Sequence, residues 1–271
     1  MTLRATACES RIDVLGVGVS PITPDDAAAT IERWIAARQR HYVCITGVHG
    51  VMMSRQDRRL RDIHNAAGMV TPDGMPLVWL SRLLGASRIE RVYGPDLMRK
   101  MTAISAERGY RQLYYGGADG VAEKLKRKLV DAHPGLQVVG QICPPFRDLT
   151  PEEDQAVVDE INAARPDIVW VGLSTPKQEY WMANHLGRID APVMVGVGAA
   201  FDFLAGTKPQ APRFMQRNGL EWLFRLLSEP RRLWRRYAYI VPAFTMLATA
   251  DLALRAGRSL MRVSTGTQLR K

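Results

Sequence analysis

The stretch Thr150–Gly172, which reads TPEEDQAVVDEINAARPDIVWVG, joins a helix to a strand. Thr150 can cap the helix, Pro151 suits its first position, and the three acids that follow suit the positive end of the helix dipole. The strongly apolar run Ile168–Gly172 then predicts a strand. Strands that alternate with helices of ten or more residues form parallel sheets with helices on both faces.

The same alternation extends along the chain. Thr23 and Pro24 repeat the helix start, with two aspartates in the first turn. We expect strands at Ile12–Val17, Tyr42–Thr46, Gln112–Tyr115, Leu136–Gly140, Ile168–Gly172 and Val193–Val197. The prediction is an α/β fold, with a Rossmann-like, mostly parallel sheet flanked by helices. Ligands of such folds bind beyond the carboxyl ends of the strands, so we take the candidate site segments to be Thr46–His49, Thr71–Gly74, Gly116–Gly120, Gly172–Gln178 and Gly196–Asp202.

Positive charge is concentrated at the C-terminus. The 271 residues carry a net charge of +10, and the segment 213–271 holds 12 Arg or Lys against three acids. Tryptophan and tyrosine are interleaved with these arginines, a pattern that suits a lipid boundary, a nucleic acid or a diphosphate. We therefore predict a core of residues 1–212 and a basic, amphipathic helical appendage of residues 213–271.

Composition indicates the compartment. A hydrophobic content of 46% excludes a disordered chain, and three scattered cysteines (Cys8, Cys44 and Cys143) favour a reducing compartment. Met1–Arg11 lacks the apolar segment of a signal peptide. The uncharged run Tyr237–Ala250 is shorter than the roughly 20 residues that a spanning helix needs. We expect a cytoplasmic protein that lies peripherally on the inner face of the cell membrane.

Two strand ends carry candidate chemistry. Gly116 and Gly117 precede a helix expected near Val121, where free backbone N–H groups could bind phosphate; a simple tight turn is the alternative. Asp73 stands in the turn Thr71–Pro76 before an apolar helix. It is either a general base or a cap of that helix.

The segment Ser174–Glu179 follows the strand at 168–172. Thr175 can cap the next helix with Pro176 in its first turn, which leaves Lys177 and Gln178 to bind a sugar hydroxyl or a phosphate. The histidines and carboxylates show no metal-ligand spacing, so we expect no metal and no other cofactor.

The appendage contains an arginine cluster. Arg232, Arg235 and Arg236 share one helix face, and Arg225 lies in the turn before. Guanidinium groups that converge in this way would bind a diphosphate through bidentate hydrogen bonds and neutralise a leaving group.

These motifs together resemble the WecG/TagA/CpsF glycosyltransferases, glycosyltransferase family 26. The matching blocks are Thr71–Pro76, Tyr93–Met98, Tyr114–Gly117, Pro144–Phe146, Val171–Glu179, Gly196–Asp202, Gly219–Arg225 and Glu229–Arg235. The resemblance implies a metal-independent, inverting transfer of a sugar from a UDP-sugar to a polyprenyl-diphosphate-linked saccharide at the cytoplasmic membrane surface, in polysaccharide synthesis.

The resemblance also implies residue roles. Asp73 is the base that acts on the acceptor hydroxyl, Thr46 helps to hold the substrates, and Gln178 is a binding residue. Arg225, Arg232 and Arg235 close over the site and contact the diphosphate. Lys177, Gly116, Gly117 and Asp202 complete the expected binding residues.

One position departs from the family. Where relatives often have Asn two residues after the threonine, this chain reads Thr46-Gly47-Val48-His49. Either His49 takes over a polar role or the sugar specificity differs.

Two other function classes are weighed against this one. A basic tail could dock a non-catalytic α/β core on nucleic acid or a membrane, but the uncharged run at 237–250 disfavours nucleic acid as the partner. A nicotinamide-dependent oxidoreductase would need the third glycine that Gly16-Val17-Gly18 and Gly196-Val197-Gly198 both lack. Self-association into a homo-oligomer stays open.

Overall fold

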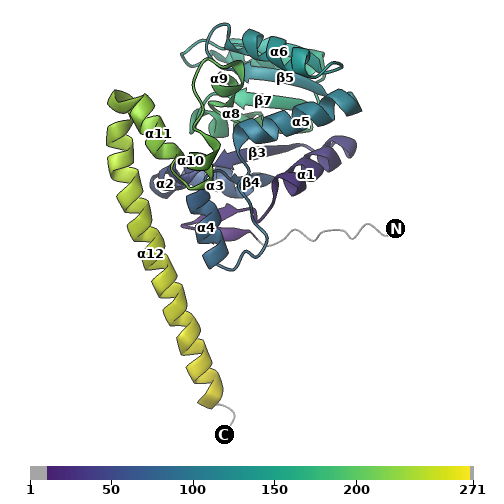
Figure 1. Ribbon diagram of the computed structural model, residues 1–271. Helices are drawn as coiled ribbons and strands as arrows, with labels where there is room; N and C mark the ends of the chain where they lie inside the picture. Colours follow the sequence, from purple (N-terminus) through teal and green to yellow (C-terminus); the bar gives the residue numbers. More distant parts are fainter. Residues whose placement is uncertain (1–10, 269–271) are drawn as a thin grey trace.

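The computed structural model describes residues 11–268, with side chains through residue 258 (Figure 1). Cys8, nearly all of the segment Met1–Arg11 and the last three residues of the predicted appendage lie outside the described residues. The strands are β1 (Ile12–Val14), β2 (Val17–Val19), β3 (His41–Thr46), β4 (Met69–Pro72), β5 (Arg111–Gly116), β6 (Gln137–Ile142), β7 (Ile168–Gly172) and β8 (Val193–Gly196). The helices are α1 (Pro24–Ala36), α2 (Val48–Gln56), α3 (Arg58–Ala66), α4 (Met75–Leu83), α5 (Gly94–Arg108), α6 (Val121–Ala132), α7 (Pro151–Ala164), α8 (Lys177–His185), α9 (Ala200–Ala205), α10 (Arg213–Arg217), α11 (Glu221–Ser228) and α12 (Pro230–Gln268).

Six strands form one parallel sheet in the order β4-β3-β8-β7-β5-β6. Because every pairing is parallel, all six carboxyl ends meet at the same edge of the sheet. The loops that leave this edge include the segments after Thr46, Pro72, Gly116, Gly172 and Gly196. The α/β prediction is confirmed, and the expected site segments lie at this edge.

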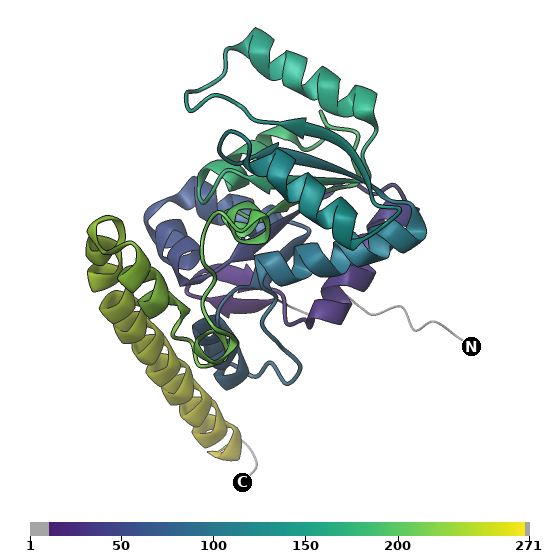
Figure 2. The same ribbon diagram turned by 45° about the horizontal axis from the view of Figure 1, so that its top comes forward.

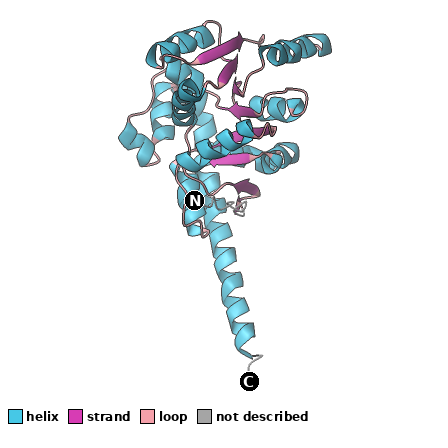
Figure 3. Ribbon diagram, turned by 90° about the vertical axis from the view of Figure 1, so that its right-hand side faces the viewer, coloured by secondary structure: helices cyan, strands magenta, loops and turns pink. Residues whose placement is uncertain are grey.

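Helices cover both faces of the sheet, and Figure 3 shows the strands between helices on the two sides. Side chains alternate along each strand, so that neighbours enter different cores: Val169 and Val171 pack with α2, α3, α4, α7 and α8, whereas Ile168 and Trp170 pack with α1, α5, α6 and α9. Strands that are buried on both sides explain why the sequence shows continuous apolar runs in place of alternation.

The predicted helix starts are confirmed at two places. Thr23 and Asp26 form a reciprocal capping box at the start of α1, and Thr150 and Glu153 form another at the start of α7. Each box pairs two backbone N–H groups that would otherwise lack partners.

Two strand predictions were wrong or incomplete. The expected strand Ile12–Val17 is a two-stranded antiparallel hairpin outside the main sheet, because the chain reverses at Leu15 and Gly16, which both have positive φ. Strand β4 was not predicted, although the segment Thr71–Gly74 was expected to lie at the end of a strand. It is only four residues long and ends in proline.

The appendage consists of α10, α11 and α12. Helices α11 and α12 lie side by side, and α12 runs down the flank of the core, as Figures 1 and 2 show. Helix α12 begins at Pro230. It continues through Pro242, and its segment Pro230–Arg258 is long and apolar enough to cross a membrane by length and composition, with a mean hydropathy of 1.4 in its most apolar window. The 14-residue uncharged run had suggested that this segment is too short to span a membrane. The length of α12 does not exclude a membrane-spanning helix.

One face of α12 is packed on the core. Ile240, Phe244 and Ala248 are buried in the same core as α2 and the β1–β2 hairpin. Near the end of the described side chains, the Arg255 guanidinium binds Asp13 at 2.9 Å. The helix is thus held to the core near its middle and again at Arg255.

Candidate active site

Asp73 stands at the carboxyl edge of the sheet, between β4 and α4. Its backbone N–H donates to the carbonyl oxygen of Thr46 at 2.9 Å, which ties the ends of two neighbouring strands together. Helix α4 is capped by Gly74, whose φ is +102°, and no side chain caps it. The alternative that Asp73 serves as a helix cap is therefore wrong. Its carboxylate, 30% exposed, is available for chemistry.

Arg91 is the main residue that the sequence analysis missed. Its Nη2 atom lies 3.5 Å from Asp73 Oδ1 and also contacts Glu221 Oε2, while its guanidinium stacks 3.9 Å from the centre of the Tyr93 ring. Its Nη1 donates to Gln216 Oε1 at 3.1 Å. The signal was present in part, because Arg91 precedes the family-like block that begins at Tyr93 by two residues.

The pKa of Asp73 suits a general base. Burial and the charge of Glu221 raise the pKa of Asp73 to about 6, against the opposing effect of Arg91 and Arg225. The carboxylate is thus ionised at neutral pH, yet it is a stronger base than an ordinary aspartate.

A cleft of about 620 Å³ opens beside Arg91. Its size is that of a small-molecule site. The residues that line it are Met75, Arg91, Asp96, Arg99, Gln210, Ala211, Pro212, Arg213, Gln216 and Arg217. Four arginines against one aspartate give the cleft a positive potential, which favours an anionic ligand. Arg99, Arg213 and Arg217 are not among the residues predicted from the sequence.

His49 lies near the appendage, in the first turn of α2. Burial, Arg236 and Arg225 together lower the pKa of His49 to about 4, so that the imidazole is neutral at physiological pH. Its neighbour Thr46 is 2% exposed, and the Thr46 hydroxyl donates to the carbonyl oxygen of Cys44 at 3.3 Å. In this structure Thr46 positions the Asp73 loop through its backbone, and a substrate contact for it stays a prediction.

The appendage arginines differ in where they lie. Arg225 reaches toward the site, where its charge acts on Asp73 and His49, and its guanidinium is 5.9 Å from the Phe203 ring centre. Arg236 also acts on His49. The predicted diphosphate ligand Arg232 pairs with Glu229 at 2.6 Å.

Arg235, the third predicted ligand, is exposed and lies 5.4 Å from the ring centre of its neighbour Trp234. Tyr237, half-buried beside Trp222, is acted on by Arg225, Arg236 and Arg232. Arg236 belongs to the arginine cluster predicted from the sequence, and the structure adds Tyr237 beside it. Roles in binding diphosphate stay predictions for all of these residues.

Gln178 is buried and organises the neighbouring loop. Its Oε1 accepts from the Gly198 N–H at 2.9 Å, and its Nε2 donates to Glu179 Oε1 at 3.1 Å. The expectation that Thr175 caps α8 is wrong, because the Thr175 hydroxyl donates to the same Glu179 oxygen at 2.9 Å. Lys177 is exposed at the start of α8.

The glycine pair after β5 is explained by sterics. A Cβ at Gly116 would lie 2.9 Å from the Gly172 backbone, and both Gly116 and Gly117 have positive φ. The Gly117 N–H donates to the Gly172 carbonyl oxygen at 3.1 Å, so it is not free for phosphate. These contacts favour the tight-turn alternative. Asp202, in α9, pairs with Lys208 at 3.2 Å and accepts a hydrogen bond from the Thr207 hydroxyl at 3.0 Å, both in the segment that follows the helix.

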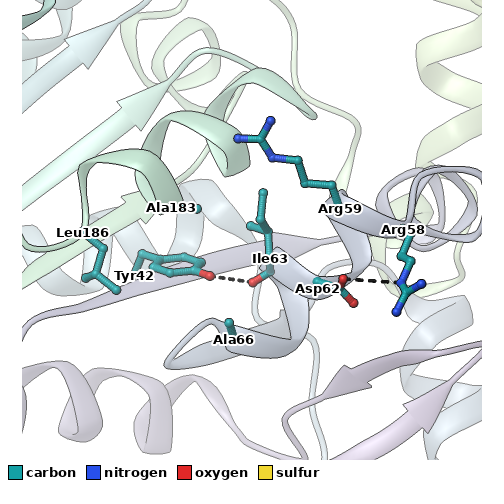
Figure 4. Close-up of a pocket in the computed structure, with 8 residues that line it drawn as sticks. All are labelled: Tyr42, Arg58, Arg59, Asp62, Ile63, Ala66, Ala183 and Leu186. Carbon is teal, nitrogen blue, oxygen red and sulfur yellow. Dashed lines mark hydrogen bonds and ion pairs between the residues drawn. The ribbon is translucent and has the colours of Figure 1, made fainter.

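A second cavity, of about 630 Å³, lies away from this site (Figure 4). Its lining includes Tyr42 near the amino end of β3, with Ile63 of α3 and Ala183 of α8. The Tyr42 hydroxyl donates to the Ile63 carbonyl oxygen at 2.6 Å. Because Asp73 and Arg91 are at the opposite edge of the sheet, this cavity is separate from the candidate chemistry.

The sequence matches the Glycosyl transferase WecG/TagA/CpsF family over residues 12–258. The chain belongs to this family. It is therefore an enzyme, a glycosyltransferase, and the alternatives of a non-catalytic binding module and a nicotinamide-dependent oxidoreductase are set aside.

Three relatives illustrate the similarity within the family, and each is named N-acetylglucosaminyldiphosphoundecaprenol N-acetyl-beta-D-mannosaminyltransferase. The protein of Bacillus spizizenii (strain ATCC 23059 / NRRL B-14472 / W23) is 32% identical over 181 residues, which cover 67% of this chain and 68% of the relative. The protein of Bacillus subtilis (strain 168) is 29% identical over 181 residues, which also cover 67% of this chain and 68% of the relative. That of Staphylococcus aureus (strain MW2) is 26% identical over 237 residues, which cover 87% of this chain and 91% of the relative.

Proposed function

We propose that this glycosyltransferase moves a sugar from a UDP-sugar to a polyprenyl-diphosphate-linked saccharide, by a single displacement with inversion and without a metal ion. Asp73 is the general base. The appendage arginines bind the diphosphate and stabilise the charge that develops on the leaving group.

The observation that carries this proposal is the setting of Asp73. It is a carboxylate that caps no helix, stands at the carboxyl edge of a parallel sheet, and pairs at 3.5 Å with Arg91, one of the four arginines that line the neighbouring cleft. An ionised base beside an arginine-rich cleft fits a reaction in which a hydroxyl loses a proton while a diphosphate leaves. The names of the relatives support the substrate classes, because each specifies a diphosphoundecaprenol-linked acceptor.

The proposed chemistry balances. Asp73 takes the proton from the acceptor hydroxyl, whose oxygen forms a bond to the anomeric carbon as the bond from that carbon to the UDP oxygen breaks. The electron pair leaves with UDP, and Arg225 offsets its charge. Burial of the base strengthens it for this step, because it raises the pKa of Asp73 toward neutrality.

A panel of donors tests the proposal. We expect purified protein to release UDP from one of UDP-N-acetylmannosamine, its uronic acid or UDP-glucose only when an N-acetylglucosaminyl-diphosphate lipid is present. UDP release would be measured enzymatically and the lipid product by mass spectrometry. Failure of every donor with this acceptor and with short-chain analogues would contradict the proposal.

We expect activity to survive a chelator. In the described part of the chain, no group of three or more His, Cys, Asp or Glu side chains could hold a metal ion. Arginine can supply the positive charge that a metal would otherwise provide. Initial rates with and without excess EDTA should agree within about twofold. Loss of activity in EDTA with recovery in Mg²⁺ or Mn²⁺ would contradict an arginine-based site.

The proposed location is the cytoplasmic face of the membrane, where α12 lies along the lipid surface. On its side away from the core, α12 exposes Met246 and Leu254, with 67% and 60% of each residue accessible. Their spacing of eight residues places them on one face. Crossing the bilayer would break the packing of the opposite face and the Arg255–Asp13 ion pair, so we favour surface binding.

The double variant Met246→Glu/Leu254→Glu should weaken binding to anionic phospholipid vesicles at least about tenfold, because it puts two charges on the lipid-facing side. The measurement is vesicle co-sedimentation. Leu186→Glu, which changes an exposed apolar residue near the opposite edge of the sheet, is the matched control and should bind normally. Wild-type binding by the double variant would mean that α12 does not face lipid.

A further inference from the structure

Glu221 is the first residue of α11, and its carboxylate joins the appendage to the core. Its Oε1 accepts a hydrogen bond from the Tyr93 hydroxyl at 3.1 Å, and its Oε2 binds Arg91 Nη2. Only 18% of the Glu221 side chain and 12% of the Arg91 side chain are exposed. Two charged groups that are buried to this extent stay there only when each has a partner.

The same Arg91 atom, Nη2, also faces Asp73 Oδ1, but at 3.5 Å. Asp73 and Glu221 therefore share one guanidinium, and Glu221 holds the closer contact. The other end of the guanidinium donates to Gln216 in α10. The appendage thus supplies two of the three acceptors that orient Arg91, and the core supplies only Asp73.

We propose that Glu221 is a positioning residue for Asp73: when the appendage docks, its carboxylate draws the Arg91 guanidinium away from Asp73 and leaves that carboxylate free to take the acceptor proton. This inference rests on the proposed function. It means that the base is competent only after the appendage has closed over the site. In an undocked enzyme, Asp73 is the carboxylate that remains beside Arg91, and the Arg91 charge makes Asp73 a weaker base.

The charged groups around Asp73 shift its pKa in the directions that the proposal requires. Arg91 from the core and Arg225 from α11 both lower its pKa, and Glu221 raises it. Tyr93, which also faces Asp73, stays protonated because burial and the two carboxylates raise its pKa. Without the charge of Glu221, two arginines act on Asp73 unopposed. Its pKa then falls, and by the Brønsted relation it removes a proton more slowly.

The test is the pH dependence of kcat/KM for the full-length Glu221→Gln enzyme. The wild-type rate should rise with pH through about 6, as Asp73 loses its proton. In Glu221→Gln this acid limb should move down by roughly one pH unit. The plateau kcat should fall about 3–10-fold because the base is weaker. The KM values for both substrates should change less than about twofold.

Three variants separate charge from docking. Glu221→Asp keeps the charge and should restore the wild-type limb. Tyr93→Phe removes a docking hydrogen bond but no charge, so its limb should not move. Asp251→Asn removes one negative charge from α12, where Asp251 pairs with Arg255, and should behave as wild type.

An unmoved limb in Glu221→Gln, with a raised KM and lowered melting temperature, would show that Glu221 only anchors the appendage, and would overturn the inference. So would a limb that moves equally in Tyr93→Phe. These outcomes differ from failure of the proposed function, in which the wild-type enzyme itself transfers no sugar.

Discussion

The Asp73→Asn enzyme is expected to lose roughly 10²–10⁴ in kcat, the usual contribution of a general base. Asparagine keeps the size of the side chain but cannot take a proton at neutral pH. Since no side chain caps α4, the change removes no helix cap. The wild-type pH profile should show an acid limb near pH 6, and the residual activity of Asp73→Asn should lack it. Steady-state kinetics from pH 5 to 9 would measure both effects.

Asp62→Asn is the matched control for this change. Asp62 makes the same exchange of carboxylate for amide on α3, where it forms only a loose i,i+4 pair with Arg58 at 3.9 Å. It should retain wild-type kcat, and both variants should unfold at nearly the wild-type temperature. If Asp73→Asn keeps most of its activity and the acid limb, another group is the base.

Arg225→Ala is expected to lower kcat/KM by about 10²–10³, the loss that follows removal of one donor to a developing anion. Among the three predicted diphosphate ligands, Arg225 is the one whose charge acts on both Asp73 and His49. Arg225→Lys should restore only part of the rate, because an ammonium group cannot make the bidentate contact of a guanidinium. The loss should appear with a soluble, short-chain acceptor as well as with a lipid acceptor.

Arg235→Ala provides the comparison within the appendage. Arg235 is exposed and lies over the ring of Trp234, so we expect a loss of less than about tenfold on the soluble acceptor. Equal losses from Arg225→Ala and Arg235→Ala would mean that the appendage closes differently when substrates bind. No loss from Arg225→Ala on the soluble acceptor would restrict the arginine cluster to the membrane.

Much of the fold could be predicted because buried parallel strands have a simple sequence signature. The runs at 168–172 and 193–196 are apolar and flanked by helix signals, and their predicted limits agree with β7 and β8 within one residue. Strand β4 was not predicted because its four residues end in proline and resemble a turn. The β1–β2 hairpin was taken for one strand because its turn is made by Leu15 and Gly16, without the asparagine or aspartate that usually marks such a reversal.

The site could be predicted only in part. Asp73 could be predicted from the turn that it occupies before an apolar helix and from the family-like block at 71–76. Its partners come from distant segments: Arg91 and Glu221 are 130 residues apart in the sequence. No local pattern predicts such a contact.

The distinction between Arg235 and Arg236 depends on the rotation of α12. Leu233 and Ile240 face the core, and Arg236 lies three residues after the first and four before the second, which places it near the buried face. That periodicity was readable from the sequence in principle. It required knowing which face of the helix is buried.

The anomeric configuration of the product tests the central claim most directly, because a single displacement with Asp73 as base must invert the anomeric carbon. The measurement is the one-bond C1–H1 coupling of the new linkage by NMR, on product made by the wild-type enzyme from an α-linked UDP-sugar and a lipid-diphosphate acceptor. A β linkage is expected. An α linkage would require a double displacement or a different attack, and would contradict the role assigned to Asp73.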